Sequence, residues 1–181
     1  MPKTLKKLVR KISLCYYKAY MKIIYKQGGM SMVSALTASN NFIKRSIAEN
    51  VELTPMKLQK LLYFLYARYL FTQQVPLFKE RFATWKYGPV IPEVYNFFSH
   101  YTKNSIDDYY YEGDRIFMID ETNSVFREII DLVWENNRDF TGTQLSNITH
   151  QDNSAWSIAD AQNNAWLLDT NIMKDGEVFF E

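Results

Sequence analysis

The chain has 181 residues, of which 47% are hydrophobic and 23% charged, so it suits one domain with a buried core and is not generally disordered. One cysteine and two histidines exclude a disulfide framework and argue against a metal site, and no cofactor is expected. No stretch approaches 18 uncharged apolar residues, so we expect no membrane span, and the lack of disulfides suits the cytoplasm.

Charge is distributed unevenly along the chain, although the net charge is only +1. Residues 1–30 carry eight basic side chains and no acidic one, and residues 31–103 carry nine basic and four acidic ones. Residues 104–181 reverse this balance, with four basic and sixteen acidic side chains. Such asymmetry hints at charged partners, but surface charge more often serves solubility.

The first thirty residues predict a basic amphipathic helix. Their basic side chains recur at steps of three and four residues, opposite a face of aliphatic and tyrosine side chains. We treat residues 1–30 as an extension of a domain formed by residues 31–181. Three interpretations of the extension stay open: a helix docked on its own domain, a segment before an alternative start at Met30 or Met32, or a helix that binds an anionic membrane surface, nucleic-acid phosphates or a partner protein.

Two long helices are expected next. Apolar residues at helical spacing predict a helix over 34–49. Thr54 as N-cap and Pro55 at the first helical position predict the start of a second helix, over 55–72. Because this helix is apolar around most of its circumference, we expect it at the centre of the core, with its aromatic side chains buried. Its polar edge is predicted to consist of Lys57, Gln59, Lys60 and Arg68.

The middle of the chain predicts a small β element. An extended segment over 82–87 is expected to end where Gly88 and Pro89 interrupt it. A small hairpin is predicted over 107–120. Its arms and turn are expected at 109–111, 116–119 and 112–114.

Short helices complete the predicted fold. Two are expected over 93–101, after Pro92, and over 123–137. A third is expected to start at the capping box of Thr141 and Gln144, and a fourth lies near 154–164. The last turns of the chain are also expected to be helical, with Thr170 as their cap. The predicted fold class is therefore mainly α with a small β element (α+β), a single compact helical domain preceded by the basic amphipathic helix.

We find no pattern that predicts catalysis. Neither a phosphate-binding loop nor a His-Glu-x-x-His motif occurs. His150, Asp152 and Ser154 lie too close in sequence for a catalytic triad, and we expect a loop and a helix cap there. Asp107 and Asp108 are expected in a solvated turn. The sequence thus favours a binding module over an enzyme.

Two runs of residues carry a resemblance to a known family. Residues 53–64, Leu-Thr-Pro-Met-Lys-Leu-Gln-Lys-Leu-Leu-Tyr-Phe, and residues 87–95, Tyr-Gly-Pro-Val-Ile-Pro-Glu-Val-Tyr, resemble two motifs of the Panacea domain family, also described as antitoxin SocA-like or phage-associated GepA-like. The segments 76–78 and 82–85 follow at the family's spacing. A third element is similar at Leu145, Thr149, His150 and Trp156, with Ala155 where the family usually has proline. The resemblance covers about residues 32–181.

The resemblance implies a mainly α antitoxin domain of a prokaryotic two-gene toxin–antitoxin system. Such an antitoxin neutralises a cognate protein toxin by direct binding. In at least one branch of the family it resembles a proteolytic adaptor that delivers the toxin to an ATP-dependent protease.

The polar edge and the Gly-Pro turn are the candidate partner-binding site. The candidates are Lys57, Gln59, Lys60, Tyr63, Trp85, Tyr87, Gly88, Pro89, Tyr95, His150 and Trp156. We expect Gly88 to adopt a backbone angle closed to other residues. We favour buried anchoring roles for Trp85 and Tyr95 over exposed binding roles. The Tyr63 hydroxyl is expected to bridge to the polar edge.

Other functions stay in competition with the antitoxin. A nucleic-acid-binding regulator would use the basic helix 1–30. A hydrolase would use His150, Asp152 and Ser154. Within the antitoxin hypothesis, the acidic half 104–181 is a candidate to occupy a basic active site of a toxin that acts on RNA. The acidic residues singled out there are Asp107, Asp108, Asp114, Asp120 and Glu121.

Overall fold

The computed structural model describes residues 33–180. Its elements are, in chain order, α2 (Ala35–Glu49), α3 (Pro55–Gln73), β1 (Ala83–Trp85), β2 (Gly88–Val90), α4 (Pro92–Phe98), the 3₁₀ helix η1 (Ser99–Tyr101), β3 (Tyr111–Glu112), β4 (Arg115–Ile116), α5 (Ser124–Asn137), α6 (Gly142–Thr149), α7 (Ala155–Ala161) and α8 (Asp169–Val178). The predicted fold class, mainly α with a small β element, is confirmed. The predicted basic helix and the boundary at residue 30 lie outside the described residues.

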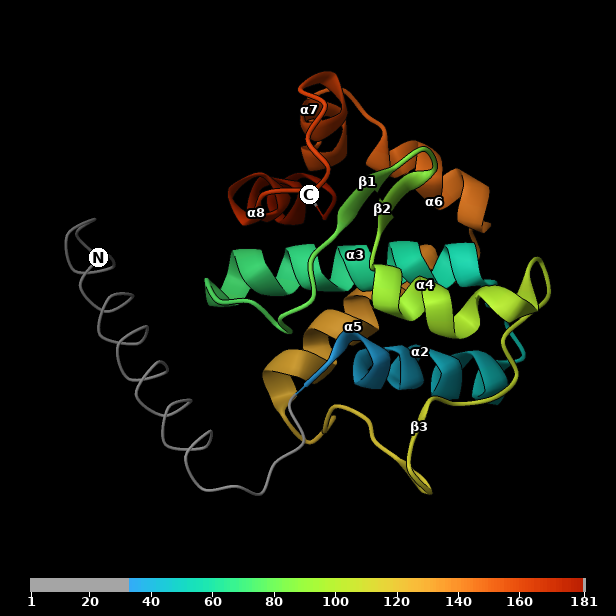
Figure 1. Ribbon diagram of the computed structural model, residues 1–181. Coiled ribbons are helices and arrows are strands. Elements are labelled where there is room, and N and C mark those ends of the chain that lie inside the picture. The colour runs from blue at the N-terminus through green and yellow to red at the C-terminus, as the bar shows by residue number, and fades with distance from the viewer. Residues whose placement is uncertain (1–32, 181) are drawn as a thin grey trace, which may run out of the picture. The chain divides into compact units, whose positions relative to one another are not determined.

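Helix α3 forms the centre of the fold, as its apolar circumference predicts. Figure 1 shows the β1–β2 hairpin, α6, α7 and α8 on one side of α3, and α2 and α5 on the other. Leu58, Leu61, Leu62 and Leu65 are fully buried, and so is the aromatic ring of Tyr63. No helix in the part of the chain that the structure describes is long and apolar enough to cross a membrane.

Local capping signals place most helix starts correctly. The Thr54 hydroxyl accepts a hydrogen bond from the backbone of Lys57, and Thr141 and Gln144 form the predicted capping box. The start of α8 was predicted wrongly. Leu168 is the N-cap and makes no side-chain cap bond, so Thr170 lies inside the helix rather than capping it.

The prediction that Gly88 and Pro89 interrupt the extended segment is wrong. The chain turns at Lys86 and Tyr87, and Gly88–Val90 returns as β2, antiparallel to β1. A third extended segment runs along the other edge of β1, where Trp166 bridges Ala83. Residues 83 positions apart in the chain form this pairing, so local sequence carries little signal for it.

The second hairpin exists where it was predicted, but its strands β3 and β4 have only two residues each. Two buried asparagines of α2 hold the flanking backbone instead. Asn40 accepts from the Tyr110 amide and donates to the Tyr110 and Phe117 carbonyls, and Asn41 bonds both backbone groups of Ile119. Side-chain bonds from a helix therefore replace strand pairing here.

Candidate functional site

The predicted polar edge of α3 is not a solvated edge. Lys57, Gln59 and Lys60 are all buried. They are covered because their polar groups bond backbone atoms of other elements rather than water. Arg68 is the member that stays partly exposed, and its guanidinium donates to the Gly176 carbonyl.

Two of these side chains hold the backbone of the Gly-Pro turn. The Gln59 amide group bonds both backbone groups of Ile91, accepting from its amide at 2.8 Å and donating to its carbonyl at 3.2 Å. The Lys60 amine donates to the Pro89 carbonyl at 2.9 Å. Since both donors sit on the central helix, they fix the path of β2 into α4.

Lys60 is a buried cation without an ion pair in the described part of the chain. Burial lowers the pKa of its amine to about 7. Gly88 lies against it with φ of +97°, which confirms the predicted left-handed backbone. A Cβ at Gly88 would lie 2.6 Å from the Thr149 hydroxyl oxygen and 2.9 Å from the Lys60 nitrogen. Both the positive φ and this lack of space therefore require glycine here.

Lys57 belongs to a different part of the surface. Its amine donates to the Arg138 carbonyl at the end of α5, and burial lowers its pKa. It lines a cleft of about 530 Å³ together with Glu52, Lys103 and Asp139. No residue of the β1–β2 hairpin lines this cleft, so the structure separates Lys57 from the other candidates.

The prediction that Tyr63 bridges to the polar edge is wrong. Its hydroxyl donates to the Asp175 carboxylate of α8. Asp175 also accepts from the Ala155 amide at the start of α7, at 3.0 Å. Burial raises the pKa of both Tyr63 and Asp175. Tyr63 therefore joins α3, α7 and α8 and is fully buried.

The exposed candidates gather on the β1–β2 hairpin and the start of α4. Trp85, Tyr87 and Tyr95 are 39%, 59% and 42% exposed, so the buried anchoring role favoured for Trp85 and Tyr95 is wrong. The rings of Trp85 and Tyr95 meet edge to face at 4.8 Å. Trp156 donates from its indole nitrogen to the Trp85 carbonyl at 2.9 Å, and the His150 ring lies 3.7 Å from the Trp156 ring. We call these five residues the aromatic ledge.

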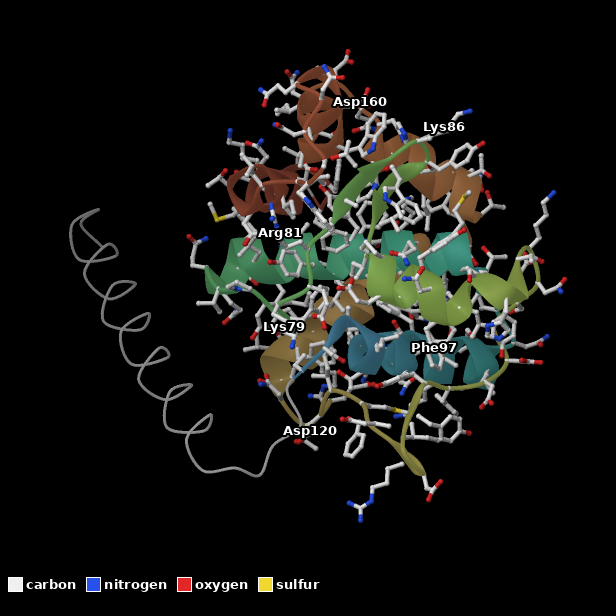
Figure 2. The ribbon with its side chains drawn as sticks, viewed as in Figure 1. Lys79, Arg81, Lys86, Phe97, Asp120 and Asp160 are labelled. Atoms are coloured by element: carbon white, nitrogen blue, oxygen red, sulfur yellow. The ribbon has the colours of Figure 1, made fainter. Side chains whose placement is uncertain are left out.

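The turn that carries the ledge is tied to α6. The Ser146 hydroxyl donates to the Tyr87 carbonyl at 2.8 Å, and a ring nitrogen of His150 lies 3.3 Å from the Lys86 carbonyl. Figure 2 shows Lys86 at the tip of the hairpin, and its amine lies 5.5 Å from the centre of the Tyr87 ring. The ledge is thus a preformed surface, because side chains of α3, α6 and α7 bond the backbone of its turn.

The residues suspected of catalysis serve structural roles. The Ser154 hydroxyl caps α7 and donates to the Thr149 carbonyl, while both ring nitrogens of His150 face carbonyl oxygens. Asp107 and Asp108 accept from tyrosine hydroxyls in an exposed turn. Among the described residues, no group of three potential metal ligands occurs.

Sequence reasoning missed several exposed aromatic side chains, among them Trp166 and Phe97. Trp166 is 40% exposed beside β1, and Phe97 of α4 packs on Tyr110 with its ring 5.0 Å away. Neither lies in a motif that the resemblance uses. The sequence around Trp166 lacks helical periodicity, and a tryptophan in such a stretch was the signal that could have marked it as a candidate.

Comparisons with known proteins point to one family. The sequence model of the antitoxin SocA-like, Panacea domain matches residues 58–157, which include most of α3, the whole β1–β2 hairpin and α6. The chain is also 28% identical over 131 residues to "Antitoxin SocA" of Caulobacter vibrioides (strain NA1000 / CB15N), which is 70% of each chain. No solved structure matches significantly.

Proposed function

Because the chain belongs to the antitoxin SocA-like, Panacea domain family, we propose that it neutralises a cognate protein toxin by direct binding, with the aromatic ledge as its contact surface. Its similarity to a curated antitoxin suggests the antitoxin role itself. The exposed aromatic side chains of the ledge are the observation that supports this choice of contact surface. Exposed tryptophan and tyrosine side chains on a backbone that hydrogen bonds already fix are typical of binding hot spots.

The arrangement of the site supports binding rather than catalysis. Among the described residues, the suspected nucleophile Ser154 is used as a helix cap, and His150 is held against carbonyl oxygens and an indole ring. We therefore propose that the protein has no enzymatic activity of its own.

The acidic half is the competing contact surface. In the structure, Glu121 pairs with Arg45 at 2.8 Å, and Asp120 accepts from the backbone and hydroxyl of Thr122. Asp107 and Asp108 are bonded to Tyr101 and Tyr111. Because four of the five singled-out carboxylates already bond within the fold, the ledge is the better candidate.

A growth-rescue assay tests the proposal. The protein encoded by the neighbouring gene is expressed from one inducible promoter and this chain from another, and rescue of growth is expected. We expect Tyr95→Ala to weaken rescue and to raise the Kd of the purified complex at least tenfold, since it removes a ledge side chain.

Tyr111→Ala is the matched control. Tyr111 is 43% exposed, against 42% for Tyr95, but it lies on the acidic hairpin. Loss of rescue by Tyr111→Ala alone would move the contact to the acidic half. A neighbouring protein that is harmless, or toxic and not rescued, would contradict the antitoxin function.

Delivery of the toxin to an ATP-dependent protease is a finer form of the proposal. The half-life of the toxin, measured with and without this chain, distinguishes it from simple blocking. An adaptor shortens the half-life of the toxin, whereas a blocking antitoxin leaves it unchanged or lengthens it.

A further inference from the structure

The segment next to β1 leaves one edge of the small sheet unpaired. The Leu167 amide donates to the Phe82 carbonyl at 2.9 Å, and the Thr84 amide donates to the Ala165 carbonyl at 3.0 Å. Because backbone groups alternate in direction along an extended chain, the amide and carbonyl of Trp166, between these two residues, point away from β1. Neither group has a partner among the described residues.

Side chains around this edge are apolar and exposed. Trp166 and Leu168 are 40% and 51% exposed, whereas Leu167 between them is buried. Trp166 pairs with Ala83, so it lies on the same face of the sheet as Trp85, two residues further along β1. The edge is therefore continuous with the face that carries the ledge.

A cationic side chain, that of Arg81, lies at the same edge. The Arg81 guanidinium lies 5.2 Å from the centre of the Trp166 ring. Arg81 is exposed and forms no ion pair with any residue that the structure describes. Figure 2 shows Arg81 and Lys86 at opposite ends of the hairpin. A carboxylate on an incoming chain would complement Arg81.

We propose that the edge at Trp166 binds an extended segment of the toxin as an added antiparallel or parallel strand, with a carboxylate of that segment paired with Arg81. The unpaired amide and carbonyl of Trp166 supply the main-chain bonds, and the exposed Trp166 and Leu168 side chains supply apolar contact. This inference rests on the proposed toxin binding and names the chemistry of the toxin segment.

Hydrogen exchange on the full chain, free and in complex with the protein of the neighbouring gene, tests this edge. We expect exchange at the Trp166 amide to slow at least tenfold in the complex. The Leu167 amide is the internal control, because it is already bonded to Phe82. Toxin binding without protection at Trp166 would overturn the edge proposal and leave the proposed function intact, and absence of binding would overturn both.

Substitutions separate the backbone from the side chain. Trp166→Ala keeps the amide and Trp166→Pro removes it, so we expect Trp166→Pro to raise the Kd at least a further tenfold. Arg81→Glu should weaken binding more than Lys79→Glu, because Lys79 is an exposed neighbour whose amine, unlike the Arg81 guanidinium, makes no cation–π contact with the Trp166 ring. Thermal melts check that each variant folds.

A second copy of this chain is the other possible occupant. Protection of Trp166 in the free chain, together with the mass of a dimer in light scattering, would assign the edge to self-association and overturn the proposal. Equal Kd values for Trp166→Pro and Trp166→Ala would overturn it as well.

Discussion

The Lys60 amine donates to the Pro89 carbonyl at 2.9 Å while its side chain is 1% exposed. An unpaired lysine buried in this way costs free energy when it is charged. Its hydrogen bond to Pro89 holds the turn that carries the ledge, so the buried amine helps to position the candidate binding surface. Tyr63, three residues further along α3, bonds Asp175 of α8 rather than Lys60.

Stability should rise with pH because of Lys60. Its pKa is about 7 in the folded protein and near 10.5 when unfolded, so the unfolded chain binds more protons between these values. The free energy of unfolding should therefore increase from about pH 7 to pH 9.5, with a slope approaching about 1.4 kcal/mol per pH unit from this group. Lys60→Met should remove that slope in urea unfolding measured across this range.

Lys44→Met is the matched control for this measurement. Lys44 is exposed on α2, so its substitution should leave the slope of the parent protein in place. Equal slopes for the parent and Lys60→Met would show that the buried amine does not titrate in this range.

At the scale of elements, α8 packs unusually closely on α3. A Cβ on Gly176 would overlap the Ala67 carbonyl group and lie 2.9 Å from the Phe71 Cβ. The Tyr63–Asp175 bond and the Arg68–Gly176 bond join the same two helices. This close approach explains why a glycine lies within a helix, where it costs about 1 kcal/mol relative to alanine.

Gly176→Ala should therefore destabilise the protein despite its better helix propensity. We expect a loss of about 1–3 kcal/mol in the free energy of unfolding, because the added methyl group forces α8 away from α3. Urea or thermal unfolding measures it. Val178→Ala, at a 61% exposed position of the same helix, should change stability far less. A neutral or stabilising Gly176→Ala would contradict the packing described here.

At the scale of the whole molecule, we propose that residues 31–181 form the antitoxin domain and that residues 1–30 are an extension. Residues 1–30 carry eight basic side chains, whereas the acidic side chains lie mainly in residues 104–181. Most of the buried hydrophobic residues among those described belong to one core cluster, which runs from Ala35 to Ile172.

A chain limited to residues 31–181 should keep its helical circular dichroism and a cooperative thermal transition. We expect it to rescue growth as well as the full chain does. Binding of nucleic acid by the full chain, falling steeply with salt and lost in the shorter chain, would instead support the regulator that uses the basic helix. Loss of folding in the shorter chain would contradict the proposed boundary.

The sequence by itself determined the features that depend on neighbours in the chain. Thr54 and Pro55 predict the start of α3, Thr141 and Gln144 that of α6, and the apolar spacing of α3 its central place. The two motifs were enough to identify the family. These signals succeed because capping and helical periodicity act over a few residues.

Only the tertiary structure decided which polar and aromatic side chains face solvent. Lys60 and Gln59 are buried because they bond the backbone of a segment about thirty residues away, whereas Trp85 is exposed on a strand that is paired along both edges. The unpaired edge at Trp166 likewise exists because residues 165–167 pair with 82–84. Such pairings join distant parts of the chain, and the local pattern of residue types carries no record of them.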